Sequence, residues 1–152
     1  MIVLRTVFVC CSGLWNGAMV FFSLVTLPRL FSSLDKVAAG DIAALLFPAY
    51  YGFGLLAGAG ALLAALMLGA SLASRRWLVI SGLLAAMLGA QAWAAFVIDP
   101  RMVALRPAAR AGEVVALGQF GALHGQAVAL NAVVLLLGLS VWIYVIVARP
   151  ND

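Results

Sequence analysis

WLVISGLLAAMLGAQAWAAFVI, residues 77–98, is a charge-free stretch with Arg76 directly before it and Asp99 directly after it. A helix needs about 20 mainly apolar residues to cross a bilayer. This stretch reaches that length without a single Asp, Glu, Lys or Arg. We therefore predict that residues 77–98 form a transmembrane helix.

Three further charge-free runs occur in the chain, at 6–28, 42–74 and 114–148. The two longer runs can each hold one span and a turn or two at the membrane interface. Strands of a transmembrane barrel would alternate in hydropathy over segments of about ten residues, and these continuous runs do not. The sequence thus predicts an all-α membrane protein, a four-transmembrane-helix bundle. Its expected spans are about 6–28, 48–73, 77–98 and 117–147.

The composition is typical of an integral membrane protein. Hydrophobic residues make up 66% of the 152 residues and charged residues 9%, whereas soluble domains are roughly half apolar and a quarter charged. We expect one transmembrane domain over residues 1–152, with the lipid bilayer as its main partner. The net charge of +4 suits anionic headgroups. With so few clustered charges, the sequence does not predict nucleic-acid binding.

The connections between the spans differ in length. Those at 29–47 and 99–116 are each expected to hold a short helix lying at the membrane interface. Pro48 fits the first turn of the second span, where its missing N–H costs nothing. Pro100 is expected to end the third span, because a residue before proline avoids the helical region. The short turn at 74–76 makes the second and third spans antiparallel neighbours.

The basic residues give a weak signal for orientation. With four spans, both termini and the 74–76 turn lie on one side, together with Arg5, Arg75, Arg76 and Arg149. Five basic residues lie on the other side, but four acidic residues accompany them there. Cytoplasmic loops carry an excess of Lys and Arg. We expect both termini to be cytoplasmic, in a bacterial inner membrane.

Small residues recur at helical spacing in the spans. Gly13 and Gly17 in the first span, and Gly121 and Gly125 in the fourth, form GxxxG motifs. Such faces let helix backbones approach closely in lipid. We predict a tight bundle and, because some faces exceed what four helices need, a homo-oligomer.

A few polar residues lie inside the expected spans. His124 is the only histidine of the chain, and Asn131 follows it by seven residues, on the same helix face. Counting from the expected span ends gives two polar levels: His124 with Gln91, slightly below Tyr50 and Tyr51, and a deeper level with Asn16 and Asn131. Inter-helix hydrogen bonds would explain the amides. An ionisable side chain inside the membrane is a functional candidate by default.

Charged residues are expected at the same end of the bundle as His124. Asp99 and Arg101 can form a local ion pair at the end of the third span, and Arg29 can join them from the first. Together with Tyr50, they suggest a polar funnel above His124. His124, Asn131, Asn16, Gln91, Tyr50, Tyr51, Asp99, Arg101 and Arg29 are the candidate binding residues.

Four motifs together resemble a known family. GLWNGAMVFFSLVTLPRLF (13–31), LFPAYYGFG (46–54), DPRM (99–102) and FGALHGQAVALN (120–131) are similar to the transmembrane protein 205-like family, also called domain of unknown function 4149. The resemblance carries the family pattern onto Leu46, Phe47, Pro48, Tyr50, Asp99, Pro100, Arg101, Phe120, His124, Gly125 and Asn131. It implies a multi-pass four-helix membrane protein and no known reaction.

Three functions remain open from the sequence. The favoured one is a small transporter or permease that accepts a cation, metal or small solute around His124, since histidine can change charge near neutral pH and bind metals. The second is a redox protein with His124 as a ligand to haem or copper, although the sequence requires no cofactor. The third is a non-catalytic assembly or scaffold protein. An enzyme is not favoured, since hydrolase and phosphate-loop motifs are missing.

Overall fold

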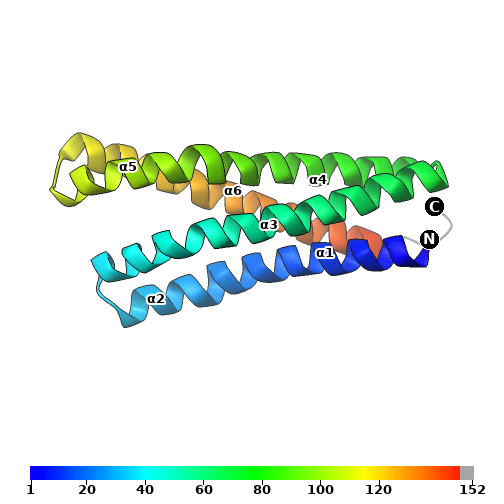
Figure 1. The fold of residues 1–152 in the computed structure, drawn as a ribbon, viewed down its shortest axis with the longest axis horizontal. Coiled ribbons are helices and arrows are strands. Elements are labelled where there is room, and N and C mark those ends of the chain that lie inside the picture. The colour runs from blue at the N-terminus through cyan, green and yellow to red at the C-terminus, as the bar shows by residue number, and fades with distance from the viewer. Residues whose placement is uncertain (148–152) are drawn as a thin grey trace.

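The computed structural model describes residues 1–147, which form four long helical rods (Figure 1). The first rod runs through α1 (Ile2–Phe21), a π-helical segment η1 (Phe22–Thr26) and α2 (Leu27–Ser33). The second is α3 (Lys36–Leu72). The third runs through α4 (Arg75–Trp93), a π-helical segment η2 (Ala94–Ile98) and α5 (Asp99–Arg110). The fourth is α6 (Val114–Val147).

Within the described residues, four helices are long and apolar enough to cross a membrane, namely Ile2–Ser33, Lys36–Leu72, Arg75–Arg110 and Val114–Val145. The prediction of an all-α bundle with four such helices is therefore confirmed. α1 packs on α3, α3 on α4, and α4 on α6, which also contacts α1. The α2–α3 and α5–α6 turns lie at one end of the bundle, and the α3–α4 turn lies at the other (Figure 1).

The rods are longer than the expected spans, because the interfacial helices are not separate from them. In the first connection, α2 continues from η1, and residues 36–47 form the first part of α3. In the third connection, α5 continues directly from η2. α3 begins at Lys36, because the Asp35 side chain accepts hydrogen bonds from the N–H groups of Val37 (2.9 Å) and Ala38 (3.1 Å). Aspartate is a preferred residue at this capping position. The turn into α4 begins at Ala73, which has a left-handed backbone (φ 48°).

Two expectations about prolines are wrong. Pro48 lies inside α3 and not in its first turn. Pro100 does not end the third rod, which continues to Arg110. Helix interiors in membranes tolerate proline when local π adjustments and neighbouring groups satisfy the freed backbone. Pro100 is the second residue of α5, which begins directly after η2. The π-helical segment therefore lies just before the position at which Pro100 lacks an N–H.

The core lies mainly between α1, α3 and α4, and Val134 and Val141 of α6 also belong to it. Trp15, Phe8, Leu68, Ile80, Leu84 and Met87 are among its fully buried side chains. Trp15 packs on Gly58, where an added Cβ would lie 2.8 Å from the Trp15 ring. Small residues on α3 thus let the bulky side chains of α1 and α4 approach its backbone.

α6 is the most peripheral of the four rods. Only 17% of its most apolar segment is buried, compared with 28–33% in the other three. Trp142 fixes it to α1 through a hydrogen bond from Nε1 to the Ser12 hydroxyl (2.9 Å). Arg76 at the start of α4 donates to the carbonyl oxygens of Tyr144 and Val145 (3.1 Å each). The outer face of α6 is left for lipid or another protein.

Candidate functional site

The two π-helical segments occupy equivalent places in the first and third rods. η1 is followed by Leu27-Pro28-Arg29, and η2 by Asp99-Pro100-Arg101. π-helical turns are rare and occur often at functional sites. Ser23 of η1 and Ile98 of η2 both line one cavity, and Asp99 follows directly after η2 in its wall. Both π-helical segments therefore lie beside the same cavity.

This inner cavity has a volume of about 180 Å³ and is bounded by all four rods. Its polar lining consists of Ser23, Tyr50, Tyr51, Asp99, His124 and Asn131. Five of these six are candidates from the sequence. The sequence therefore identified most of a cluster that only the packing of the rods brings together.

A chain of hydrogen bonds crosses the inner end of this cavity. The Tyr50 hydroxyl donates to Oδ1 of Asn131 (2.5 Å), and Nδ2 of Asn131 donates to the Ser23 hydroxyl (2.9 Å). The chain links α3, α6 and η1. Ser23 was not predicted, although it lies seven residues after Asn16, on the same face of the first rod. Its partner Asn131 is half-buried, so the chain orients the amide and keeps it satisfied.

Four aromatic rings form one wall of the cavity. The rings of Phe22 and Tyr50 are stacked at 4.4 Å, and those of Phe47 and Tyr51 at 5.7 Å, between ring centroids. Tyr50 and Tyr51 are 5.3 Å apart, and Phe22 and Phe47 meet edge to face at 5.4 Å. All four line the cavity. Such a wall presents aromatic faces and edges to whatever enters.

Asp99 and His124 differ from the other polar residues of the cavity. Within residues 1–147, neither side chain has a hydrogen-bond or ion-pair partner. Asp99 is half-buried and His124 is exposed. The expected ion pair of Asp99 with Arg101 does not form, because residues two apart on a helix do not face each other. The cavity therefore contains a carboxylate and an imidazole that no described side chain hydrogen-bonds or pairs with at ion-pair distance. Arg106 acts on Asp99 only through longer-range electrostatic attraction.

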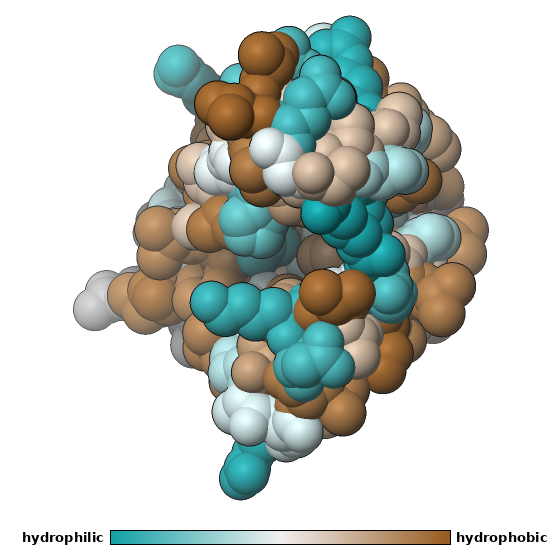
Figure 2. All heavy atoms as spheres, turned by 90° about the vertical axis from the view of Figure 1, so that its left-hand side faces the viewer, coloured by the Kyte–Doolittle hydropathy of each residue, from teal (hydrophilic) through white to brown (hydrophobic). Residues whose placement is uncertain are grey.

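A second, outer cavity of about 370 Å³ adjoins the first. The two share Leu27, Phe47, Met102 and His124 in their walls. Lys36, Arg106 and Arg110 line the outer cavity as well. Figure 2 looks onto this end of the bundle and shows a hollow near its centre with hydrophilic side chains around it. His124 thus lies where the outer cavity meets the inner one.

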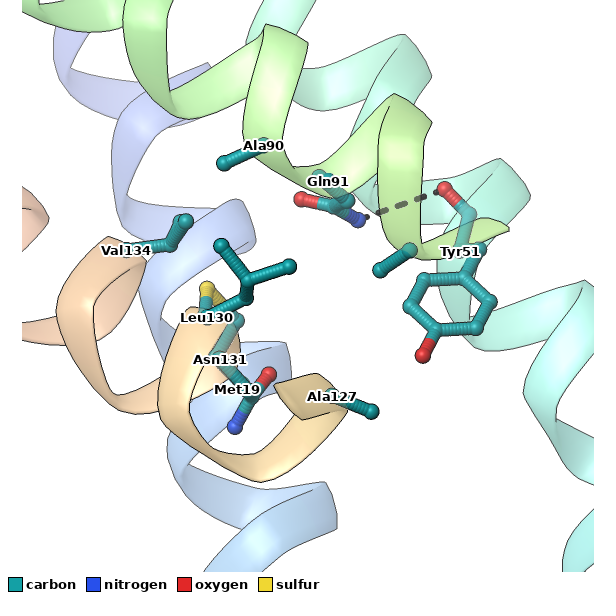
Figure 3. A pocket seen from close by; sticks show the side chains of 9 residues that line it. Met19, Tyr51, Ala90, Gln91, Ala127, Leu130, Asn131 and Val134 are labelled. Carbon is teal, nitrogen blue, oxygen red and sulfur yellow. Dashed lines mark hydrogen bonds between the residues drawn. The ribbon is translucent and has the colours of Figure 1, made fainter. Parts of the chain in front are cut away.

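A third, small space of about 10 Å³ lies deeper and shares Tyr51, Ala127 and Asn131 with the inner cavity. Such a volume is about that needed by one water molecule. Figure 3 shows Gln91 from α4 and Asn131 from α6 on opposite sides of it. Gln91 accepts a hydrogen bond from Nε1 of Trp15 (2.6 Å) and donates to the Tyr51 carbonyl (3.4 Å). Trp15 was not predicted, and its bond gives Gln91 a packing role.

Asn16 lies away from this cluster, and its expected level with Asn131 is wrong. Its Nδ2 donates to the Ser12 carbonyl (2.9 Å), and its side chain packs on Gly138 of α6. Asn131 instead meets Ser23. The expected depths were counted from Leu27 and from residue 117, on the assumption that both lie at the same depth. Asn131 lies beside Ser23, so residue 117 extends further outward than Leu27, and Asn131 lies nearer the outer end than expected.

Arg29 and Arg101 are exposed and line none of these three cavities. Asp41 was not predicted, yet it pairs with Arg106 (3.6 Å) and Arg110 across the α3–α5 contact. Nothing in the local sequence marks this pairing, since its members lie far apart along the chain. Among residues 1–147, no group of three or more His, Cys, Asp and Glu could hold a metal ion.

These features define a multi-pass, all-helical membrane protein with a polar cluster between its four rods. The chain belongs to the family described as a domain of unknown function (DUF4149), whose model matches residues 10–111. That match ends before α6, so His124 and Asn131 lie beyond it. No curated protein and no solved structure matches the chain.

Proposed function

We propose that this protein is a small permease that binds an organic solute with a positively charged group in its inner cavity. The single observation that carries the proposal is the half-buried Asp99 carboxylate, which lines the same cavity as four aromatic rings and has no hydrogen-bond or ion-pair partner among residues 1–147. A carboxylate that is removed from water costs free energy unless a cation pairs with it. A bound cation would supply that pairing.

The aromatic wall favours an organic cation over a bare metal ion. Cations are attracted to the faces of Tyr and Phe rings, and clusters of such rings recognise quaternary ammonium groups. A metal ion would require several ligating side chains, and no such group occurs in the described part of the chain.

His124 is proposed to take part in access to the inner cavity. It lines both cavities, so a solute that passes from one to the other would pass its imidazole. Replacing this side chain should therefore change how readily a solute reaches the inner cavity.

We also propose the finer features that the sequence predicts. These are one transmembrane domain, a bacterial inner membrane, cytoplasmic termini and a likeness to transmembrane protein 205-like proteins. In that orientation the outer cavity opens on the periplasmic side. The alternative of a scaffold protein is supported by the Trp15–Gln91 and Tyr50–Asn131 bonds, which hold helices together without needing a ligand.

Equilibrium dialysis of the purified protein against labelled choline tests the proposal. The neutral compound 3,3-dimethyl-1-butanol, which has the same shape without the charge, serves as the comparison ligand. We expect saturable choline binding that Asp99→Asn weakens about tenfold or more, as loss of a charged interaction does. Asp35→Asn is the matched control, because it removes an exposed negative charge at the same end and keeps a capping side chain.

Equal binding of the two ligands, or equal binding by wild type and Asp99→Asn, would leave the scaffold alternative in place. Choline flux into proteoliposomes then tests the permease step. We expect flux in wild type, and reduced flux in His124→Gln with the fold retained. Binding without flux would restrict the function to binding.

A further inference from the structure

The outer cavity combines an apolar interior with a basic edge. Leu27, Phe31, Val37, Ala43, Leu117 and Phe120 supply apolar lining. Lys36, Arg106 and Arg110 are its charged residues. This combination matches an amphiphile and differs from the acidic, aromatic inner cavity.

The charges around the outer cavity do not balance. Within residues 1–147, Asp41 is the one carboxylate at ion-pair distance from these cations, at 3.6 Å from Arg106 and in direct contact with Arg110. Arg106 also donates to the Gly40 carbonyl (2.9 Å), and only 19% of its side chain is exposed. Lys36 has no hydrogen-bond or ion-pair partner within residues 1–147. Three cations against the Asp41 carboxylate and, at longer range, the Asp99 carboxylate leave a positive excess at an apolar opening.

We propose that the outer cavity binds an anionic phospholipid, with one acyl chain against the apolar lining and the headgroup phosphate near Lys36, Arg106 and Arg110. Guanidinium groups match phosphate geometry well. Basic groups near a membrane surface attract anionic lipids. The cavity lies near the end of the rods that carries the α2–α3 and α5–α6 turns, where membrane-spanning helices would approach the headgroups. The lipid site rests on different charged residues from the Asp99 proposal, although the two cavities share Leu27, Phe47, Met102 and His124 in their walls.

Native mass spectrometry of the full chain in detergent tests the lipid site. Phosphatidylglycerol and phosphatidylcholine with identical acyl chains are added in separate titrations. We expect preferential retention of phosphatidylglycerol. Lys36→Gln and Arg106→Gln should each weaken it about fivefold, since a basic residue near the surface contributes that much. Arg75→Gln is the charge control, because Arg75 is exposed at the opposite end of the bundle and should leave retention unchanged.

A second variant tests the acyl chain separately from the charges. A Cβ added at Gly40 meets no atom within 4 Å, so Gly40→Leu should fold and place its side chain in the outer cavity. We expect it to reduce phosphatidylglycerol retention while every charge remains. Equal retention of both lipids, or an effect of Arg75→Gln as large as that of Arg106→Gln, would overturn the proposal. Competition by inorganic phosphate alone, or by a fatty acid in preference to the phospholipid, would also overturn it.

Discussion

Tyr50 and Asn131, which are 81 residues apart in sequence, are joined by a hydrogen bond from the Tyr50 hydroxyl to Oδ1 of Asn131. Through Asn131 the bond continues to Ser23, so it connects the second and fourth rods to the first. It also borders the inner cavity, in which Asp99 and His124 have no hydrogen-bond or ion-pair partner among the described residues. The bundle thus satisfies the polar groups of Tyr50, Asn131 and Ser23 through bonds between its own helices.

Removing this hydroxyl should destabilise the bundle without changing its shape. Tyr50→Phe leaves Oδ1 of Asn131 without its donor. Hydrogen bonds between transmembrane helices contribute about 0.6 kcal/mol on average and about 1.7 kcal/mol at most. We expect a loss in this range, measured by reversible unfolding in mixed micelles. Tyr51→Phe is the control, because no hydrogen bond from the Tyr51 hydroxyl occurs in residues 1–147. An equal loss in both variants would contradict the assignment.

Two glycines of α3 should respond oppositely to the same change. A Cβ at Gly54 would overlap Nε2 of Gln91, and moving that amide would break its bond with Trp15. We expect Gly54→Ala to cost about 1–3 kcal/mol, as overpacked core sites do. A Cβ at Gly52 meets no atom within 4 Å. Gly52→Ala should be neutral or stabilise by up to about 1 kcal/mol, because alanine favours helix. Thermal melts in detergent distinguish the two outcomes.

The first GxxxG motif separates internal packing from self-association. A Cβ at Gly13 would lie 2.9 Å from the Trp142 ring, whereas one at Gly17 meets nothing within 4 Å. We expect Gly13→Leu to lower the thermal stability of the chain. If the predicted homo-oligomer uses the open face, Gly17→Leu should reduce the mass measured by light scattering in detergent and leave stability unchanged. A monomeric wild type would refute the oligomer.

Cysteine accessibility tests which loops share a side of the membrane. In a background of Cys10→Ala and Cys11→Ala, single cysteines replace Lys36, Ser74 and Glu113. The structure places residues 36 and 113 at one end of the bundle and residue 74 at the other. We expect an impermeant thiol reagent to label the first two from the periplasm and Ser74→Cys only after lysis. Labelling of all three from one side would rule out four spans.

The four rods follow from the sequence alone. A charge-free run as long as 77–98 is stable as a helix in the lipid bilayer. The hydropathy of such a run is the sum of its own residues, so the span can be predicted without knowing which helices pack against it. The polar candidates were predicted in the same way. Asn131, Tyr50 and Asp99 lie in or beside apolar runs, where a polar side chain costs free energy unless it is hydrogen-bonded, paired or functional.

Tertiary packing decided which of these residues meet. The close contacts of Gly58 with Trp15 and of Gly138 with Asn16 set how far one rod slides along the next. That register brings Asn131 to Ser23 and not to Asn16. Counting residues from an assumed span end cannot predict this register, because shifting one rod by two helical turns against its neighbour hardly changes the hydropathy of the residues inside the bilayer. The cavities and the Asp41–Arg106 pair likewise depend on rods that are distant in sequence, so only the assembled bundle defines them.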